Sequence, residues 1–126
     1  MLALGCDLRV MADGPYRRHL NEHAIGLALP TWAITLAESG IPARHHVEAI
    51  LHARPYSPAE ALERAIISGL AIPPETVLAE ALRRAAPLTA LDARAYGESK
   101  RRQRAQVVRW AEQQLETEGM ARPGPA

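Results

Sequence analysis

Helical spacing interrupted by proline and glycine covers most of this chain, and it limits the fold to a set of short helices. From Pro30 onward, apolar residues recur every three or four positions, which is the spacing of one helix face. Ser57-Pro58-Ala59-Glu60 is a complete start signal, with an N-cap serine, a proline at the first helical position and a glutamate at the third. The sequence predicts helices over residues 29–38, 44–53, 58–68, 73–86 and 91–118, which make roughly two-thirds of the chain helical.

The start of the chain follows a different pattern. Residues 1–11 are apolar at most positions, whereas most domains begin with a polar, frayed segment. Leu8-Arg9-Val10-Met11 predicts a short strand, and Asp13-Gly14-Pro15 predicts the turn that follows it. We expect one or two short strands in an otherwise helical chain. We also expect the apolar start to belong to a core that a preceding segment completes.

Composition excludes several classes of protein. The chain has 126 residues, enough for one domain, and its 48% hydrophobic and 23% charged residues are typical of a globular chain. A formal net charge of +1 gives no global attraction for nucleic acid or for an anionic membrane. No apolar run reaches the ~20 residues of a membrane span. Phe is absent, so the core has to be built from Ala, Leu, Ile and Val.

The single cysteine and the first residues bear on the cellular compartment. Cys6 has no second cysteine to pair with, so we expect no internal disulfide and predict a small buried side chain there. The basic stretch that opens a signal peptide is missing before the apolar residues. A cytoplasmic location is the prediction that follows.

Glu22 is the strongest candidate for chemistry. It stands in an otherwise apolar stretch, between turn signals. Partial desolvation raises the pKa of a carboxyl group toward neutrality, which suits such a group to general acid–base catalysis. An exposed glutamate at the rim of a pocket is the alternative, and the spacing alone leaves both interpretations open.

The other polar clusters carry weaker signals. Five histidines include His45 and His52, seven residues apart, but no cysteine or carboxylate completes a ligand spacing typical of zinc, so we predict no metal site. Lys100-Arg101-Arg102-Gln103-Arg104 is the one basic cluster. It is either a solvated helix face or a phosphate contact. Without interleaved aromatic residues it does not favour nucleic acid, although RNA binding stays open as a third hypothesis.

Several segments resemble the crotonase (enoyl-CoA hydratase/isomerase) superfamily, in the order in which that family carries them. Leu2 to Ala12 resembles its "ALACDLRIAA" segment, and Asn21 to Leu27 resembles the "PE…GL" segment that follows. Arg54 to Glu63 resembles the later "AEEAL" helix, and Lys100 stands where the family often carries a lysine. The resemblance covers most of residues 1–118 and implies an α/β crotonase-like spiral fold, represented in this chain by its mostly helical C-terminal half.

The same resemblance implies where the chemistry lies. Glu22 matches the second catalytic glutamate of the hydratases, which moves a proton at the α and β carbons of an acyl-CoA thioester. Met1 stands in the place of the first glutamate, and Pro30-Thr31-Trp32 replaces the glycine-rich stretch that helps to place the hydratase water. Both departures count against hydration. The resemblance implies that members with one carboxylate more often shift a double bond or carry out other enolate chemistry. The two oxyanion-hole amides that stabilise the enolate belong to the segment before Leu2.

Further expectations rest on the resemblance alone. Lys100 is implied as a weak contact to a phosphate of coenzyme A, which is part of the substrate, so no separate cofactor is expected. The implied partners are an acyl-CoA and further copies of the chain in a trimer or a dimer of trimers, with no membrane and no nucleic acid. The expected divisions are residues 1–27 as the end of the spiral core, 28–120 as the helical part with the oligomerisation helices, and 121–126 as a disordered tail. The alternative function is a catalytically inactive helical fragment for interaction or oligomerisation.

Overall fold

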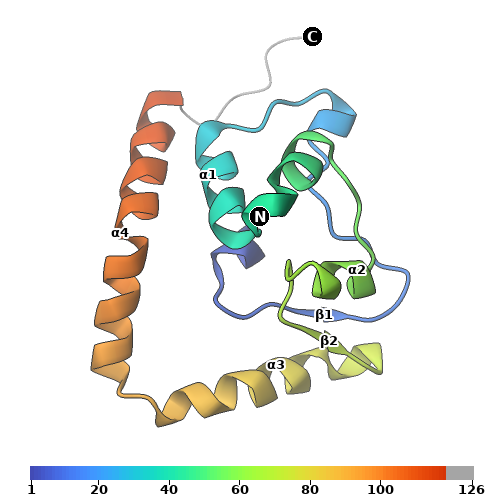
Figure 1. Cartoon of the computed structure of the whole chain (residues 1–126), viewed down its shortest axis with the longest axis vertical. Helices are drawn as coiled ribbons and strands as arrows, with labels where there is room; N and C mark the ends of the chain where they lie inside the picture. Colours follow the sequence, from blue (N-terminus) through green and yellow to red (C-terminus); the bar gives the residue numbers. More distant parts are fainter. Residues whose placement is uncertain (119–126) are drawn as a thin grey trace.

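A small parallel sheet joins the first part of the chain to its middle (Figure 1). The computed structural model describes residues 1–118. Strand β1 (Val10–Ala12) pairs with β2 (Gly69–Ala71), with Met11 opposite Leu70. The predicted strand at residues 8–11 is therefore confirmed, shifted toward its C-terminal end. The second strand begins at Gly69, where we predicted only the end of a helix.

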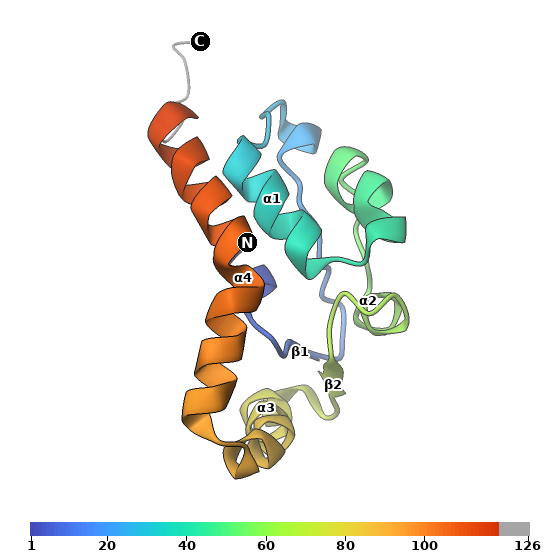
Figure 2. The same cartoon turned by 60° about the vertical axis from the view of Figure 1, so that its left-hand side comes forward.

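Residues 1–118 contain four α-helices. They are α1 (Thr31–Gly40), α2 (Pro58–Glu63), α3 (Val77–Ala85) and α4 (Ala93–Glu118). In Figures 1 and 2, α4 runs alongside α1, and α3 lies beneath the two strands. Short 3₁₀ turns connect these elements, beginning with Leu2–Gly5 at the start of the chain. The mostly helical content agrees with the sequence prediction.

The start of α2 forms as the sequence predicts. The Ser57 hydroxyl accepts a hydrogen bond from the Glu60 amide at 3.3 Å, and the Glu60 carboxylate accepts one from the Ser57 amide at 2.9 Å. Such a reciprocal pair satisfies two amides that a helix start otherwise leaves unpaired. The predicted length is wrong, however. The helix ends at Glu63, because Ala65 adopts a left-handed backbone with φ of 55° and turns the chain toward β2.

The helix predicted over residues 44–53 is also wrong. The segment forms a 3₁₀ turn, Ala43–His45, and then a π-helical turn, Val47–Leu51. Ile50 is buried, but Val47 and Leu51 are more than half exposed, so the three residues do not share a buried face. The wider π turn rotates successive side chains by less than 100° and breaks the 3.6-residue period on which the prediction rested.

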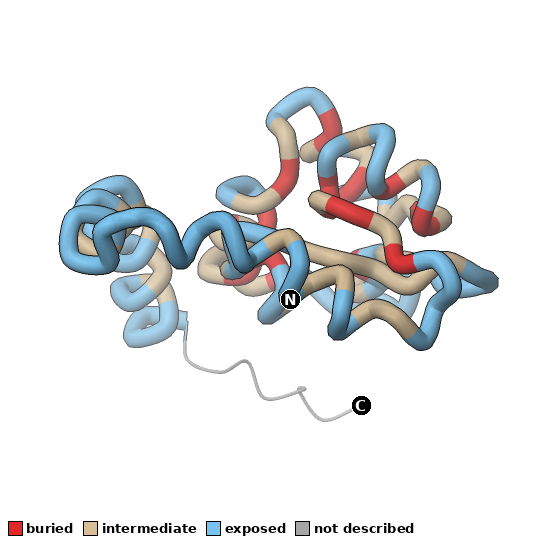
Figure 3. Tube along the Cα trace, turned by 90° about the horizontal axis from the view of Figure 1, so that it is seen from below, coloured by how far each residue is buried: buried red, intermediate tan, exposed pale blue. Residues whose placement is uncertain are grey.

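The hydrophobic core lies entirely within residues 1–71 of the described chain. Figure 3 shows the buried positions gathered on one side of the molecule, away from α4. Leu4 is 1% exposed, and α1 packs closely beside it because a Cβ at Gly40 would lie 2.7 Å from the Leu4 carbonyl oxygen. The buried apolar residues are Leu4, Leu20, Leu29, Ala33, Ala37, Ile41, Ala49, Ile50, Tyr56, Ala61, Ile66, Ile67 and Ala71.

Three further expectations concern the ends and the surface of the chain. Cys6 is exposed, so its predicted burial is wrong: it follows the first 3₁₀ turn on the side facing away from the core. The tail predicted at 121–126 lies outside the described residues, and the division of the chain at residue 27 stays a prediction. Among residues 1–118, no helix is both long enough and apolar enough to cross a membrane.

Candidate active site

Glu22 stands at the entrance of a tight turn that the sequence fixes locally. The 3₁₀ turn His23–Ile25 begins directly after it, and Gly26 closes the turn with a φ of 78°, a conformation that glycine adopts without strain. The Glu22 carbonyl accepts hydrogen bonds from the amides of Ile25 at 3.1 Å and Leu27 at 2.9 Å. The backbone of this glutamate is therefore held in place.

The Glu22 side chain is partly buried, as the sequence prediction requires. Its Oε2 atom is shielded from solvent and has no hydrogen-bond partner. Ile25 and Leu27, in the same turn, are exposed apolar residues. His23 joins the turn to the π-helical segment, because its Nδ1 lies 3.2 Å from the Leu51 carbonyl oxygen. A shielded carboxylate beside apolar surface is suited to moving a proton on a hydrocarbon chain.

Arg18, four positions before Glu22 in the sequence, is a second charged residue with a shielded polar atom. Arg18 is a partly buried residue whose Nη2 atom, like Glu22 Oε2, is shielded and without a partner. Burial lowers the pKa of the Arg18 guanidinium, and the charge of Glu22 opposes that effect. The sequence analysis did not identify Arg18, because in sequence it is one of two adjacent arginines in a polar loop. The signal that distinguishes it is its backbone pairing with Tyr56, which only the folded chain shows.

Tyr56, paired with Arg18 through the backbone, belongs to a larger polar network. Its ring is buried and lies under two guanidinium groups, with the Cζ of Arg54 5.2 Å and that of Arg64 6.0 Å from the ring centroid. Glu48 binds Arg54 at 2.7 Å and His45 at 2.9 Å. Burial raises the pKa of the Tyr56 hydroxyl to about 12, with a further contribution from the neighbouring Glu48. The Arg54 hydrogen bond lowers the pKa of Glu48 to about 2. At neutral pH the carboxylate is charged and the phenol is not.

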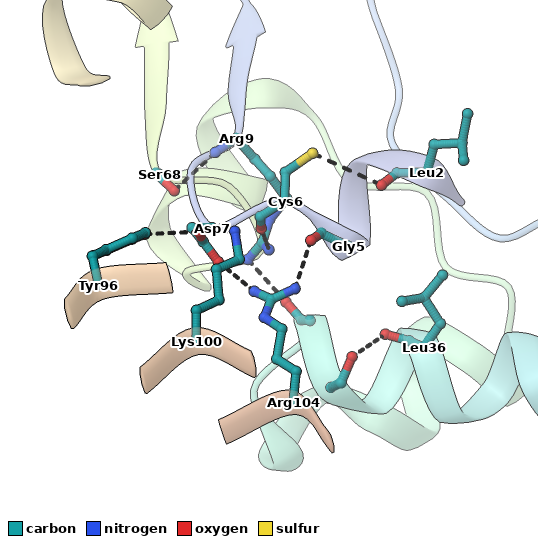
Figure 4. A network of polar contacts seen from close by, with 12 residues as sticks. Leu2, Gly5, Cys6, Asp7, Arg9, Leu36, Ser68, Tyr96, Lys100 and Arg104 are labelled. Carbon is teal, nitrogen blue, oxygen red and sulfur yellow. Dashed lines mark hydrogen bonds and ion pairs between the residues drawn. The ribbon is translucent and has the colours of Figure 1, made fainter. Parts of the chain in front are cut away.

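Lys100, the predicted contact to a phosphate of coenzyme A, lies in a separate polar network (Figure 4). Its Nζ is 2.5 Å from Asp7 Oδ2, which also accepts a hydrogen bond from the Tyr96 hydroxyl at 2.9 Å. Arg104 binds the other Asp7 oxygen and donates to the Gly5 carbonyl at 2.6 Å. These groups, with the Lys100 hydrogen bond contributing most, hold the pKa of Asp7 below its usual 3.8. The structure thus places Lys100 in an ion pair that joins α4 to the first turn.

The rest of the basic cluster is also paired. Arg101 and Arg102 both bind Glu98, at 2.7 and 2.9 Å. Arg101 and Arg102 are exposed, as the solvated-face interpretation predicts, whereas Lys100 and Arg104 lie on the side of α4 that binds Asp7. The phosphate contact of Lys100 stays a prediction.

His45 and His46 make hydrogen bonds within the fold, which is an ordinary structural role for a histidine. His45 is buried between Glu48 and Arg44, and His46 Nε2 lies 2.8 Å from the Ile41 carbonyl oxygen. His45 and His52 do not share a helix face, because the helix that would align them is absent. Within residues 1–118, no three histidine, cysteine or carboxylate side chains are grouped so that they could hold a metal ion.

Known proteins similar to this chain agree with the resemblance seen in the sequence. The family model described as Enoyl-CoA hydratase/isomerase matches residues 1–122. Mitochondrial enoyl-CoA delta isomerase 1 of Mus musculus is 40% identical over 68 residues, which are 53% of this chain and 24% of that protein. The matched segment thus spans about a quarter of the length of this curated relative.

Solved structures show the same similarity in three dimensions. Human mitochondrial delta3-delta2-enoyl-CoA isomerase matches with a TM-score of 0.79 and 32% identity, over 93% of this chain and 44% of that one. An enoyl-CoA hydratase/isomerase family protein from Pseudomonas syringae matches with a TM-score of 0.86 over 93% of this chain and 50% of that one. At 23% identity the second match speaks for the fold alone.

The expected crotonase-like fold is confirmed by these matches, which cover nine-tenths or more of this chain but about half of each solved structure. They do not favour the alternative of a catalytically inactive helical fragment for interaction or oligomerisation. Taken with the family model, which extends over nearly the whole sequence, they establish that the chain belongs to the enoyl-CoA hydratase/isomerase family.

Proposed function

We propose that Glu22 is the acid–base residue of an enoyl-CoA isomerase to which this chain contributes the C-terminal half of the fold. The observation that carries the proposal is the shielded, unpartnered Oε2 of Glu22, in a turn that also carries the exposed apolar residues Ile25 and Leu27. The names of the similar mouse and human proteins, both isomerases, support the choice of reaction. Met1, where the resemblance implies the first hydratase glutamate, adds to that support.

The proposed reaction moves one double bond and consumes no co-reactant. The Glu22 carboxylate takes a proton from C2 of a 3-enoyl thioester, and the electron pair spreads into the thioester carbonyl as a dienolate. The protonated Glu22 then returns the proton to C4, so the double bond lies between C2 and C3. The dienolate needs hydrogen-bond donors at its oxygen, and the resemblance assigns these amides to the other half of the fold.

The test joins residues 1–126 to the remaining half of the similar human isomerase and follows the conversion of a 3-enoyl-CoA to its 2-enoyl isomer. Glu22→Gln keeps the size of the side chain but cannot carry the proton. We expect kcat to fall by ~10²–10⁴-fold with little change in KM. Glu63→Gln is the matched control, because Glu63 is exposed at the end of α2.

Two results would contradict the proposal. Undiminished turnover by Glu22→Gln would remove Glu22 as the acid–base residue. Hydration of a 2-enoyl-CoA faster than isomerisation of the 3-enoyl-CoA would favour the hydratase reaction, which is the second candidate within this family. Residues 1–126 alone should turn over neither substrate.

The oligomeric state and the location also remain proposals. We propose that the chain self-associates, because Leu78 and Leu82 expose their side chains one helical turn apart on α3, and Trp110 does so on α4. Sedimentation at micromolar concentration tests this, and a sharp monomer would contradict it. The trimer and the cytoplasmic location stay predictions, and the similar mouse protein carries the word mitochondrial in its name.

A further inference from the structure

We propose that His23 is a positioning residue for Glu22, an inference that rests on the proposed role of that glutamate. His23 directly follows Glu22, and its ring joins the Glu22 turn to another segment, because Nδ1 lies 3.2 Å from the Leu51 carbonyl oxygen. A carbonyl oxygen only accepts hydrogen bonds, so Nδ1 carries the proton and donates it. Figures 1 and 2 both show the two segments, blue and green, next to each other.

The Glu22 turn has few other anchors. Between Leu20 and Leu29, which are 4% and 8% exposed, every residue is exposed except Glu22, which is partly buried. The backbone hydrogen bonds of the turn close within it, such as those from the amides of Ile25 and Leu27 to the Glu22 carbonyl. These bonds give the turn its shape but do not tie it to its surroundings. Exposed segments with few buried contacts open most easily, so a single hydrogen bond to a neighbouring element has a large effect on where the carboxylate lies.

The acceptor of this hydrogen bond is held firmly. Leu51 is the last residue of the π-helical turn, and the carbonyls at a helix end lack partners inside the helix. Ala53, two residues later, has a φ of 49°, so the chain turns away there. Ile50, beside the acceptor, is 3% exposed and fixes this segment in the core. The histidine ring therefore satisfies a free carbonyl and ties an exposed turn to a fixed point.

The first test needs no catalytic activity. The ring nitrogens of His23 are observed by ¹⁵N NMR in residues 1–126, in mildly alkaline solution where the imidazole is neutral. We expect the tautomer with the proton on Nδ1, because that nitrogen donates to Leu51. An unconstrained histidine in water favours the proton on Nε2, and the exposed His19 is the internal control for that form. A proton on Nε2 of His23 would overturn the inference.

The second test separates the hydrogen bond from the ring. His23→Asn places an amide N–H where Nδ1 stands, His23→Gln places it one bond farther along, and His23→Ala removes it. Hydrogen exchange of the Ile25 and Leu27 amides reports on the turn. We expect exchange to quicken about tenfold in His23→Ala and His23→Gln, and to stay near the original rate in His23→Asn. His19→Ala is the matched control and should leave these rates unchanged. Equal exchange in the unchanged chain and in His23→Ala would overturn the inference.

The last test connects the hydrogen bond to Glu22. In the joined isomerase described above, we expect His23→Ala to lower kcat about tenfold with little change in KM, and His23→Asn to recover most of the loss. In the Glu22→Gln background His23→Ala should have no further effect on kcat, because no acid–base group is left to position.

Unchanged kcat in His23→Ala, or a full tenfold loss in the Glu22→Gln background, would overturn the positioning role. If the joined protein is inactive throughout, the proposed function fails, and the tautomer and the exchange rates still decide whether His23 holds the turn of Glu22.

Discussion

Two regions of this molecule are held together in different ways. We call residues 1–71 the core region and residues 72–118 the arm, which contains α3 and α4. All residues that are buried in the described chain lie in the core region. The arm joins the core region through the Asp7 network, through the packing of α3 against the two strands and through the contact of α4 with α1. Arg84 of α3 also donates to the Ser68 carbonyl at 2.7 Å. Between α4 and α1 a hollow of about 310 Å³ remains, lined by Leu36, Ser39, Gln103, Arg104 and Val107.

The two regions are stabilised by different kinds of interaction. Burial of apolar surface stabilises the core region, and it responds little to salt or pH. Ion pairs with partly exposed partners provide part of the attachment of the arm, and these weaken when salt screens them or when a carboxylate is protonated. Conditions that leave the core region folded should therefore release the arm first.

The largest expected effect comes from truncating a buried side chain in the core region. Leu4→Ala removes a side chain that is 1% exposed, so we expect the free energy of unfolding to fall by ~3–5 kcal/mol. Leu82→Ala is the matched change in the arm, where the side chain is 62% exposed, and it should cost less than ~0.5 kcal/mol. Urea unfolding measures both. Equal losses would show that the arm is packed as tightly as the core region.

Arg9 is expected to have the next largest effect, because it is a polar contact inside the core region. Its guanidinium donates to the carbonyls of Ile66 at 2.7 Å, Gly40 at 2.9 Å and Cys6 at 3.0 Å. Arg9→Met keeps the length of the stem and leaves these oxygens without their donor, so we expect a loss of ~2–3 kcal/mol. Arg102→Met on the exposed face of α4 is the control, and its unfolding curve should not move.

A smaller effect is expected where the arm attaches. Asp7→Asn removes the charge that binds Lys100 and Arg104, and we expect a loss of about 1 kcal/mol. The pKa of Asp7 is lowered in the folded chain, so its contribution is fully present above the usual value of 3.8 and is lost as the pH falls through the lower folded value. The difference between the unchanged chain and Asp7→Asn should therefore vanish in acid.

Added salt gives an independent check of the Asp7 contact. At ~1 M NaCl the Debye length falls to ~3 Å, so the stability difference between the unchanged chain and Asp7→Asn should shrink. Leu4→Ala should keep its full effect at the same salt concentration. A salt-independent Asp7→Asn effect would mean that packing, not charge, holds the arm.

The smallest effect has the opposite sign. Ala65 follows α2 with a φ of 55°, and a left-handed alanine costs ~1–2 kcal/mol. Ala65→Gly relieves this strain but increases the entropy of the unfolded chain, so we expect a net gain of up to ~1 kcal/mol. Ala59→Gly, inside the same helix, should instead lose ~0.5–1 kcal/mol. If Ala65→Gly lowered the free energy of unfolding as Ala59→Gly does, the left-handed backbone at Ala65 would not be strained.

Local signals predicted the parts of the fold that depend on neighbours in sequence. The Ser57 start of α2, the strand at Val10 and the end of α3 before Pro87 need only the residues beside them. Glu22 was identified because its apolar surroundings and its resemblance to a family motif lie in one short segment. Such features are set within a few residues, so a single sequence is enough to find them.

Contacts between distant residues were not predictable in this way. Strand β2 forms because Gly69 and its neighbours pair with β1, and nothing in Ser68-Gly69-Leu70-Ala71 alone indicates that partner. Lys100 meets Asp7 across 93 positions, and Arg18 meets Tyr56 across a loop of the chain. The position of Arg18 therefore depends on tertiary pairing, whereas the position of Glu22, whose catalytic role stays a prediction, depends on its own turn.

The parallel pairing of β1 with β2 has a consequence for how the chain reaches this structure. Val10 meets Gly69, so the two strands cannot join until the residues between them have closed a loop. Closing a flexible loop of that length costs ~3–4 kcal/mol in conformational entropy, and the strand pairing has to offset this cost. The local turns and helices between the strands shorten the effective loop when they form first. Folding is therefore expected to end at the sheet, and a backbone cleavage between the strands would convert an intramolecular pairing into one that depends on protein concentration.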